Sequence, residues 1–261
     1  MDTMTRVRKH YDFAKTLVPE ERIIGVFLYG AQNYNMDDEF SDVDTRCIYA
    51  PSFDELVFPA GITNKEEILD NDEHLTLIDI RNFMRAIRMS DPSHLETLFT
   101  KYFILGPNFQ ELWGDFVQHR ELIARYQPYA FVNIAYHISN NAAERQKKSP
   151  YNPKHTAIIF RYESLVKDYI EGKPLEKAYI PEKADFFIKV KRGLYTRNEG
   201  LRHNQNSIDC IKEMADKYGL TMKNVVNVKA REIIEEYQKI FIQHQILKEL
   251  GEIKNENKRF D

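Results

Sequence analysis

Two apolar runs of strand length lie close together near the N-terminus, and they constrain the fold more than any other feature of the chain. Residues 22–30 (RIIGVFLYG) end at a glycine, and residues 42–50 (DVDTRCIYA) are followed by Pro51. Short runs rich in β-branched and aromatic residues, bounded by Gly or Pro, are typical of strands. The sequence therefore predicts strands at 22–30 and 42–50, and residues 74–80 (HLTLIDI) predict a third.

Helical spacing of apolar residues accounts for most of the remaining chain. It predicts helices over 2–17 and 80–89, and in the second half it recurs in segments separated by turn residues, mostly prolines, with no convincing strand among them. These segments are 111–126, 129–146, 155–170, 183–193 and 228–250. We therefore predict an α+β chain, with an N-terminal α/β domain over 1–105 and an all-helical domain over 106–261.

Composition and charge narrow the class of protein. The 261 residues are 43% hydrophobic, enough for a packed core, and the net charge of −3 gives no general attraction to nucleic acid or to anionic membranes. Two cysteines exclude a disulfide framework and a Cys-rich zinc site. No apolar run approaches the ~18 residues of a membrane span, and the first residues carry charges where a signal peptide is apolar. We expect a soluble cytoplasmic protein with no membrane partner.

Asp42 and Asp44 lie two residues apart in the second predicted strand, so their side chains share one face. Two carboxylates at that separation repel each other unless a cation lies between them. Mg²⁺, or Mn²⁺ in its place, takes oxygen ligands, commonly one or two protein carboxylates together with substrate phosphates. Gly30 and Ala31 end the first predicted strand in a turn whose backbone N–H groups can approach phosphate oxygens. Metal-binding carboxylates beside such a turn indicate phosphoryl or nucleotidyl transfer.

This stretch resembles the DNA polymerase beta-like nucleotidyltransferase superfamily, whose hallmark is an apolar strand, a Gly-Ser or Gly-Gly turn, a spacer and Asp-x-Asp. It is more similar still to a group of predicted nucleotidyltransferases of bacteria and phages, whose motif is close to G-S-x-x-Y-G, then S-D-x-D-x-R-x-I-Y, then Pro. The residues that match are Gly30, Tyr34, Ser41, Asp42, Asp44, Arg46, Ile48, Tyr49 and Pro51. Weaker matches, which extend the resemblance over about residues 20–195, are Phe83, Pro92, Leu95, Glu96, Lys154, His155 and Arg161.

The resemblance implies a minimal nucleotidyltransferase domain, a short mixed sheet with flanking helices, followed by the helical domain, with the active site in the cleft between them. It implies Mg²⁺-dependent transfer of a nucleoside monophosphate from a nucleoside triphosphate, ATP first among them, to an acceptor hydroxyl with release of pyrophosphate. The acceptor stays open between an RNA 3′ end such as that of tRNA, a protein side chain and a small molecule. Two residues depart from the motif. Ala31 replaces Ser or Gly and lacks a hydroxyl, and Asn35 replaces Gly in a turn, where Asn tolerates positive φ.

The resemblance also assigns the site residues. Asp42 and Asp44 would bind the metal and be catalytic, and a third carboxylate from the neighbouring strand would position the nucleophile. Glu73 and Asp79 are the candidates for this third carboxylate, although Asp79 fits a helix N-cap equally well. We expect Arg46 to point away from the two aspartates and to be structural. The candidate nucleotide-binding residues are Gly30, Ala31, Tyr34, Ser41, Lys154, His155, Arg161 and Arg192.

Basic residues of the second half supply the predicted counter-charge for a triphosphate. Lys154 and Arg161 are seven residues apart, so they share a face of the predicted helix, and a guanidinium matches phosphate oxygens. A basic run is more often a solvated face, and only the resemblance favours phosphate binding. A second basic cluster lies at 189–197, and we expect Lys191 or Arg192 of this cluster to reach the same cleft. Tyr34 is predicted either to line this cleft or to stack on a base.

Two other interpretations stay open at this point. Ala31 and the uncertain third carboxylate favour a non-catalytic module, derived from the same fold, that binds a nucleotide or a protein partner. An antitoxin-like enzyme that adenylylates a partner protein is the other. Both can be distinguished from a general nucleotidyltransferase only by what the pocket binds and transfers.

Overall fold

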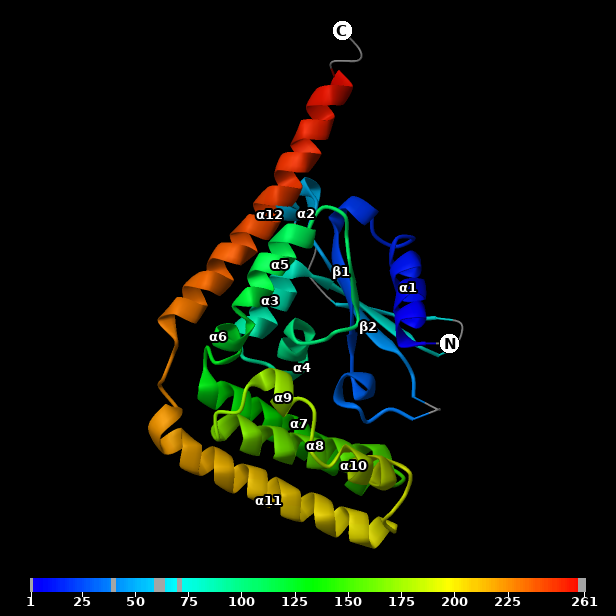
Figure 1. The fold of residues 1–261 in the computed structure, drawn as a ribbon, viewed down its shortest axis with the longest axis vertical. Helices are drawn as coiled ribbons and strands as arrows, with labels where there is room; N and C mark the ends of the chain where they lie inside the picture. Colours follow the sequence, from blue (N-terminus) through cyan, green and yellow to red (C-terminus); the bar gives the residue numbers. More distant parts are fainter. Residues whose placement is uncertain (1, 39–40, 59–63, 70–71, 258–261) are drawn as a thin grey trace.

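A five-stranded mixed sheet forms the N-terminal part of the molecule (Figure 1). The strand order is β3-β4-β2-β1-β5, in which β2 and β4 are parallel and the other neighbouring pairs are antiparallel. The computed structural model describes residues 2–38, 41–58, 64–69 and 72–257. The strands are β1 Ile23–Tyr29, β2 Asp44–Tyr49, β3 Lys65–Ile68, β4 His74–Asp79 and β5 Phe103–Leu105.

Helices flank the sheet, and the described residues after β5 form helices and no further strand. The elements of the sheet region are α1 Thr3–Ala14, α2 Phe53–Val57, α3 Ile80–Arg88 and α4 Pro92–Leu95, with 3₁₀ turns η1 Glu20–Arg22, η2 Ala31–Tyr34 and η3 Glu96–Leu98. The later helices are α5 Gln110–Gln118, α6 Arg120–Ala124, α7 Pro128–Lys148, α8 Pro153–Ile170, α9 Leu175–Ala178, α10 Ala184–Lys191, α11 Arg197–Met222 and α12 Val228–Asn257.

Both faces of the sheet are covered, which explains why β1 is apolar on both sides. On one face α1 packs through Val7 and Tyr11 against residues such as Val26. On the other face Phe27 contacts Trp113 of α5, with 4.4 Å between ring centroids. Figure 1 shows α1 on one side of the sheet and α3, α5 and α12 on the other. A strand buried on both faces has no polar side, so it reads as a continuous apolar run.

The core on the α5 face continues into the C-terminal helices. Its buried side chains include Trp113 and Phe241, and the same cluster reaches Phe131 of α7 and Tyr169 of α8. The rings of Phe131 and Tyr169 stack with 3.9 Å between centroids. Because one cluster of buried side chains crosses residue 105, the division into domains over 1–105 and 106–261 stays a prediction.

The α+β class is confirmed, with a short mixed sheet first and a helical region after it. The three strands that the sequence predicted are β1, β2 and β4, whereas β3, β5 and the long helix α11 were not predicted. In the part of the chain that the structure describes, no helix combines the length and the apolar character needed to cross a membrane.

Candidate functional site

A pocket of ≈ 640 Å³ lies where the sheet meets the C-terminal helices. One wall comes from the end of β1, the start of β2, η2 and η3, and the other from α7, α8 and the end of α10. Nine of the predicted site residues line it: Gly30, Ala31, Tyr34, Ser41, Asp42, Asp44, Lys154, Arg161 and Arg192. Glu73, Asp79 and His155 are not among the residues that line this pocket.

The turn after β1 requires a glycine. Gly30 has φ 92° and ψ −155°, a conformation that residues with a Cβ rarely adopt, and η2 follows at once. The Gly30 backbone lies close enough to the Glu96 carboxyl to lower its pKa, so the turn and this acid are neighbours. Asn35 ends η2 in the left-handed region, at φ 54° and ψ 32°. Asn adopts this region more readily than most residues, so its presence in place of Gly keeps the turn.

Asp42 and Asp44 both line the pocket, as alternation along a strand predicts. Asp42 is exposed just before β2, and the half-buried Asp44 opens β2 opposite Tyr29. Asp44 Oδ1 is buried and has no hydrogen-bond partner among the described residues. Burial raises the pKa of Asp44, while His74 and Lys154 oppose this shift. A desolvated carboxylate oxygen without a partner is a place where a cation would lower the free energy.

Arg46 also lines the pocket, so the prediction that it points away from the aspartates was wrong. It lies two residues beyond Asp44 on β2 and therefore shares the face of Asp44. Its guanidinium lies over the Tyr29 ring, 4.0 Å from the centroid, and Nη1 donates to the Ser93 carbonyl at 2.6 Å. Arg46 therefore ties the strand that carries Asp44 to α4.

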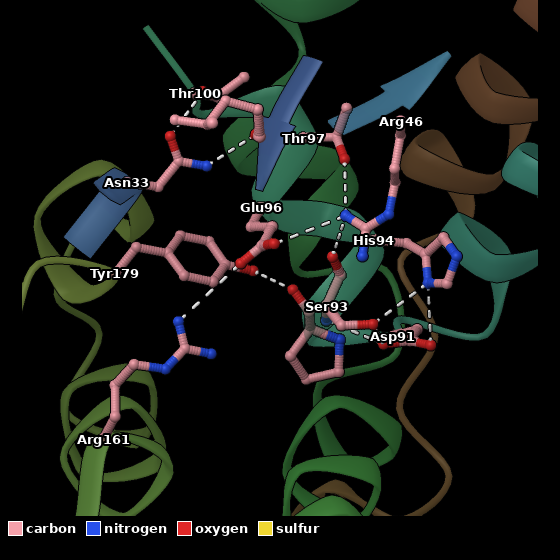
Figure 2. Close-up of polar contacts among 12 residues, drawn as sticks. Asn33, Arg46, Asp91, Ser93, His94, Glu96, Thr97, Thr100, Arg161 and Tyr179 are labelled. Atoms are coloured by element: carbon pink, nitrogen blue, oxygen red, sulfur yellow. Dashed lines mark hydrogen bonds and ion pairs between the residues drawn. The ribbon is translucent and has the colours of Figure 1, made fainter. Parts of the chain in front are cut away.

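A buried acid, Glu96 of η3, lies between two arginines at the pocket wall (Figure 2). Arg46 Nη1 lies 3.5 Å from Glu96 Oε1, and Arg161 Nη1 of α8 lies 3.9 Å from Glu96 Oε2. Burial raises the pKa of Glu96 to about 8, although Arg161 and the Gly30 N–H both lower it. In the sequence Glu96 is only one of the weaker matches and is assigned no place in the site, and its signal there is a lone acid in the apolar segment 95–99 (LETLF).

The raised pKa of Glu96 has a measurable consequence for stability. Between the ordinary glutamate value of 4.5 and about 8, the folded chain holds a proton that the unfolded chain has lost. The free energy of unfolding should therefore fall as pH rises through this window, by at most ~1.4 kcal/mol per pH unit from this group, and not beyond it. Glu96→Gln removes this titration, so urea unfolding at several pH values should show the variant gaining on the wild type toward pH ~8. Parallel pH profiles of the two proteins would contradict the shift.

Tyr34 lines the pocket, but its ring is too covered to stack on a base. Arg161 Cζ lies 3.6 Å from the ring centroid, and the Tyr179 ring stacks against Tyr34 at 6.3 Å between centroids. Only 5% of Tyr34 is exposed. The apolar surface of the pocket comes instead from residues such as Ile138 of α7 and Ile158 of α8.

The first turn of α8 carries a cation near the aspartates. The Asn152 side chain caps the helix by accepting from the Lys154 N–H at 2.9 Å. Lys154 is exposed, lines the pocket and lies close enough to Asp44 to oppose the rise of its pKa. The N-terminus of this 18-residue helix adds partial positive charge. His155 is not among the residues that line the pocket. Its Nδ1 is buried and has no hydrogen-bond partner in the part of the chain that the structure describes, and burial lowers its pKa.

Basic residues at the end of α10 hold the loop that precedes Asp42. Lys191 Nζ donates to Ser41 Oγ at 2.7 Å and lies 3.4 Å from Asp38 Oδ1. Arg192 Nε lies 3.6 Å from Asp38 Oδ2. Ser41, which the sequence predicted to bind nucleotide, thus already accepts a hydrogen bond from Lys191. These contacts join Asp38 and Ser41, which precede Asp42 in the chain, to the helical wall of the pocket.

Glu73 and Asp79 each take part in a structural contact away from the pocket. Glu73 is buried, with Oε2 2.9 Å from His10 Nε2 and an ion pair to Arg6, both residues of α1. Asp79 caps α3, accepting from the Arg81 N–H at 2.7 Å and pairing with the Arg81 guanidinium. The N-cap alternative for Asp79 is therefore confirmed. Neither carboxylate is placed where it could meet Asp42 and Asp44.

The two aspartates fit Mg²⁺ or Mn²⁺ only together with ligands that a substrate brings. Within the described ranges, no group of three or more His, Cys, Asp or Glu side chains could hold a metal on its own. Mg²⁺ often has just one or two protein carboxylates, and substrate phosphates and water complete its shell. The unpartnered Oδ1 of Asp44 is a suitable ligand atom. This donor set favours an ion that binds with a nucleotide over one that is permanently held.

Comparisons with known proteins add a distant likeness. No protein-family model matches the chain, and a search of curated proteins finds no match. Among solved structures, the chain is similar to a nucleotidyltransferase-like protein from Exiguobacterium sibiricum, with 12% sequence identity and a TM-score of 0.33, over 84% of this chain and 76% of that one. At this identity and score the likeness says nothing about the activity of this chain.

Proposed function

We propose that this protein is a Mg²⁺-dependent nucleotidyltransferase. It moves a nucleoside monophosphate from a nucleoside triphosphate, ATP first, to an acceptor hydroxyl and releases pyrophosphate. The observation that carries the proposal is the pair Asp42 and Asp44, with Asp44 Oδ1 unpartnered, in one pocket with basic side chains from two helices. Carboxylates that can bind a metal, placed beside cations that can bind phosphates, are the groups that nucleotidyl transfer requires.

Asp42 and Asp44 would hold the Mg²⁺ or Mn²⁺ ion. When bound, the ion would offset the negative charge of the triphosphate and of the pyrophosphate that leaves. Asp44 is half-buried and unpartnered on one oxygen, so it is ready to act as a ligand without first breaking a protein contact at that atom. Asp42 is exposed, so it can adjust to the phosphates that arrive.

The chain's own cations would bind the triphosphate. Lys154 and the N-terminus of α8 lie on the helical wall near Asp44, where a phosphate can meet both a full and a partial positive charge. Arg192, more than half exposed at its side chain, adds a guanidinium from α10. Ala31 contributes no hydroxyl, so any contact from this residue to a phosphate is limited to its backbone N–H. These groups would orient the α-phosphate for attack by the acceptor.

The acceptor hydroxyl would enter on the side where Asp42 is exposed. An RNA 3′ end such as that of tRNA, a protein side chain and a small molecule are the acceptors to test, and an antitoxin-like enzyme would use the second. A nucleotide-binding module without catalysis is the second candidate function. One observation favours it: neither Glu73 nor Asp79 lines the pocket, so neither of the two candidates for the third carboxylate would serve as a base there.

The test is to incubate the protein with each α-labelled nucleoside triphosphate and Mg²⁺, with bulk tRNA, a protein extract or simple polyols as acceptors. We expect pyrophosphate release and label on one acceptor class, with ATP giving the highest rate. Calorimetry with the same nucleotides separates the candidates. Nucleotide binding without transfer to any acceptor would support the non-catalytic module, and the absence of binding would contradict both.

A further inference from the structure

Two buried polar atoms at the pocket wall face each other without a hydrogen bond (Figure 2). Arg161 is 6% exposed and Glu96 is 3% exposed, and both line the pocket. Arg161 Nη1 and Glu96 Oε2 lie 3.9 Å apart, beyond hydrogen-bond distance. Neither atom has a hydrogen-bond partner elsewhere among the described residues. The two groups form a long ion pair, drawn as a dashed line in Figure 2, but each of the two atoms lacks a hydrogen bond.

Neighbouring contacts hold these side chains apart. The Arg161 guanidinium lies over the Tyr34 ring at 3.6 Å and near the Tyr162 ring at 4.7 Å. The other oxygen of Glu96, Oε1, lies 3.5 Å from Arg46 Nη1, and this contact holds the Glu96 side chain in place. Buried groups of this kind are costly to leave without hydrogen bonds, and more so when they are charged. Buried polar atoms that belong to pocket-lining residues and have no hydrogen-bond partner among the described residues have the character of a prepared ligand site.

A hydroxyl is the group that satisfies both atoms. Arg161 Nη1 can only donate, whereas Glu96 Oε2 accepts when ionised and can donate or accept when protonated. A hydroxyl can accept from Arg161 and still pair with Glu96 in either state. A phosphate oxygen only accepts, so the ionised acid would repel it. We propose that Glu96 and Arg161 together bind a ribose hydroxyl of the nucleotide, which makes the pocket selective for ribonucleotides.

The position of Arg161 along α8 favours the sugar of the nucleotide as the source of this hydroxyl. This step of the inference rests on the proposed function. Lys154 and Arg161 are seven residues apart on one helix, which corresponds to about 10 Å along its axis. Ala157 and Ile158 line the pocket between them. A nucleotide with its phosphates at Lys154 would extend its sugar toward Arg161. An acceptor would approach from the exposed Asp42 and would have to pass the nucleotide to reach Glu96.

The test compares the affinities of ATP and 2′,3′-dideoxy-ATP for the wild-type protein by calorimetry with Mg²⁺. We expect dideoxy-ATP to bind about 10- to 100-fold more weakly, as for the loss of hydrogen bonds to charged groups. The 2′-deoxy and 3′-deoxy nucleotides then identify the hydroxyl. In Glu96→Ala the ratio should approach one, and in Glu96→Gln it should be largely retained, because an amide can also donate and accept. Glu213→Ala, an exposed change on α11, is the matched control and should keep the wild-type ratio.

The possible failures are distinguishable. Equal binding of ATP and dideoxy-ATP by the wild-type protein would overturn the inference and leave the proposed function standing. A wild-type ratio that persists in folded Glu96→Ala would also overturn it, because other residues would then recognise the hydroxyl. Binding of neither nucleotide would contradict the proposed function itself. The wild-type comparison needs no variant, so the inference stays testable even if Glu96→Ala does not fold.

Discussion

Replacing Asp44 with Asn should lower the rate of nucleotide transfer by about 100- to 1,000-fold, the usual effect of removing one group that stabilises developing charge. Asn has the size of Asp but no charge, so the pocket keeps its shape and loses the carboxylate proposed to bind the metal. Because burial already raises the pKa of Asp44, the change should leave the free energy of unfolding the same or slightly higher. The measurements are pyrophosphate release at saturating ATP over a range of Mg²⁺ concentrations, and urea unfolding.

Two further variants complete this experiment. Asp42→Asn should give a loss of the same order, because both carboxylates line one pocket. Asp115→Asn changes an exposed aspartate of α5 that does not line the pocket, so its rate should match the wild type. Full transfer activity in both Asp42→Asn and Asp44→Asn would show that these carboxylates are not the metal ligands. A large loss of stability in Asp44→Asn would show that the residue is structural.

The part of the site that the sequence predicted rests on short-range geometry. Asp42 and Asp44 are two residues apart at the start of a strand, and strand alternation alone places them on one side. Strand alternation also places Arg46 on the pocket face, so the prediction that Arg46 points away from the two aspartates misapplied this rule. Gly30 was predictable for a similar reason, because the end of an apolar run at a glycine marks a turn with special backbone angles.

The positions of Glu73 and Asp79 were not predictable, because an acid near a strand end has several equally good uses. Asp79 starts a helix, and an N-cap needs the same residue type as a metal site. Glu73 pairs with Arg6 and His10, which lie more than sixty residues away in the chain. No local pattern specifies such a pairing. Glu96 was among the weaker matches, but its place in the site was not predictable, because a lone acid in an apolar segment does not identify its partners.

The elements that the sequence missed lack the periodicity on which prediction depends. β3 (KEEI) is an edge strand with mostly exposed side chains, so it has no apolar face to reveal it. β5 has only three residues. α11 is 26 residues long but buries few apolar side chains, and it contains Gly200 and Gly219 at close contacts with tyrosine rings. In each case tertiary packing, and not local propensity, selects the structure.

Gly106 directly follows β5 on the way to α5. Of the described glycines, it should be the one whose replacement lowers the free energy of unfolding most. An added Cβ would lie 1.8 Å from the Ile23 carbonyl oxygen and 2.8 Å from the carbon of that carbonyl. The Gly106 N–H donates to the Ile24 carbonyl at 3.0 Å, which holds the two backbones together. Gly106→Ala should therefore lower the free energy of unfolding by about 3 kcal/mol or more. A thermal melt should show a fall of roughly 6–12 °C.

Gly114→Ala is the matched control, since the same chemical change is made eight residues later in the interior of α5. A Cβ on Gly114 meets nothing within 4 Å, so the better helix propensity of Ala should raise the free energy of unfolding by about 0.5–1 kcal/mol. Gly106 contacts the start of β1, at the opposite end of that strand from Gly30, so nucleotide affinity well below the melting temperature should change little in Gly106→Ala. Equal stability of Gly106→Ala and the wild type would mean that β5 does not approach β1 as closely as described. A fall in stability together with lost nucleotide binding at low temperature would mean that strain at the start of β1 reaches the pocket.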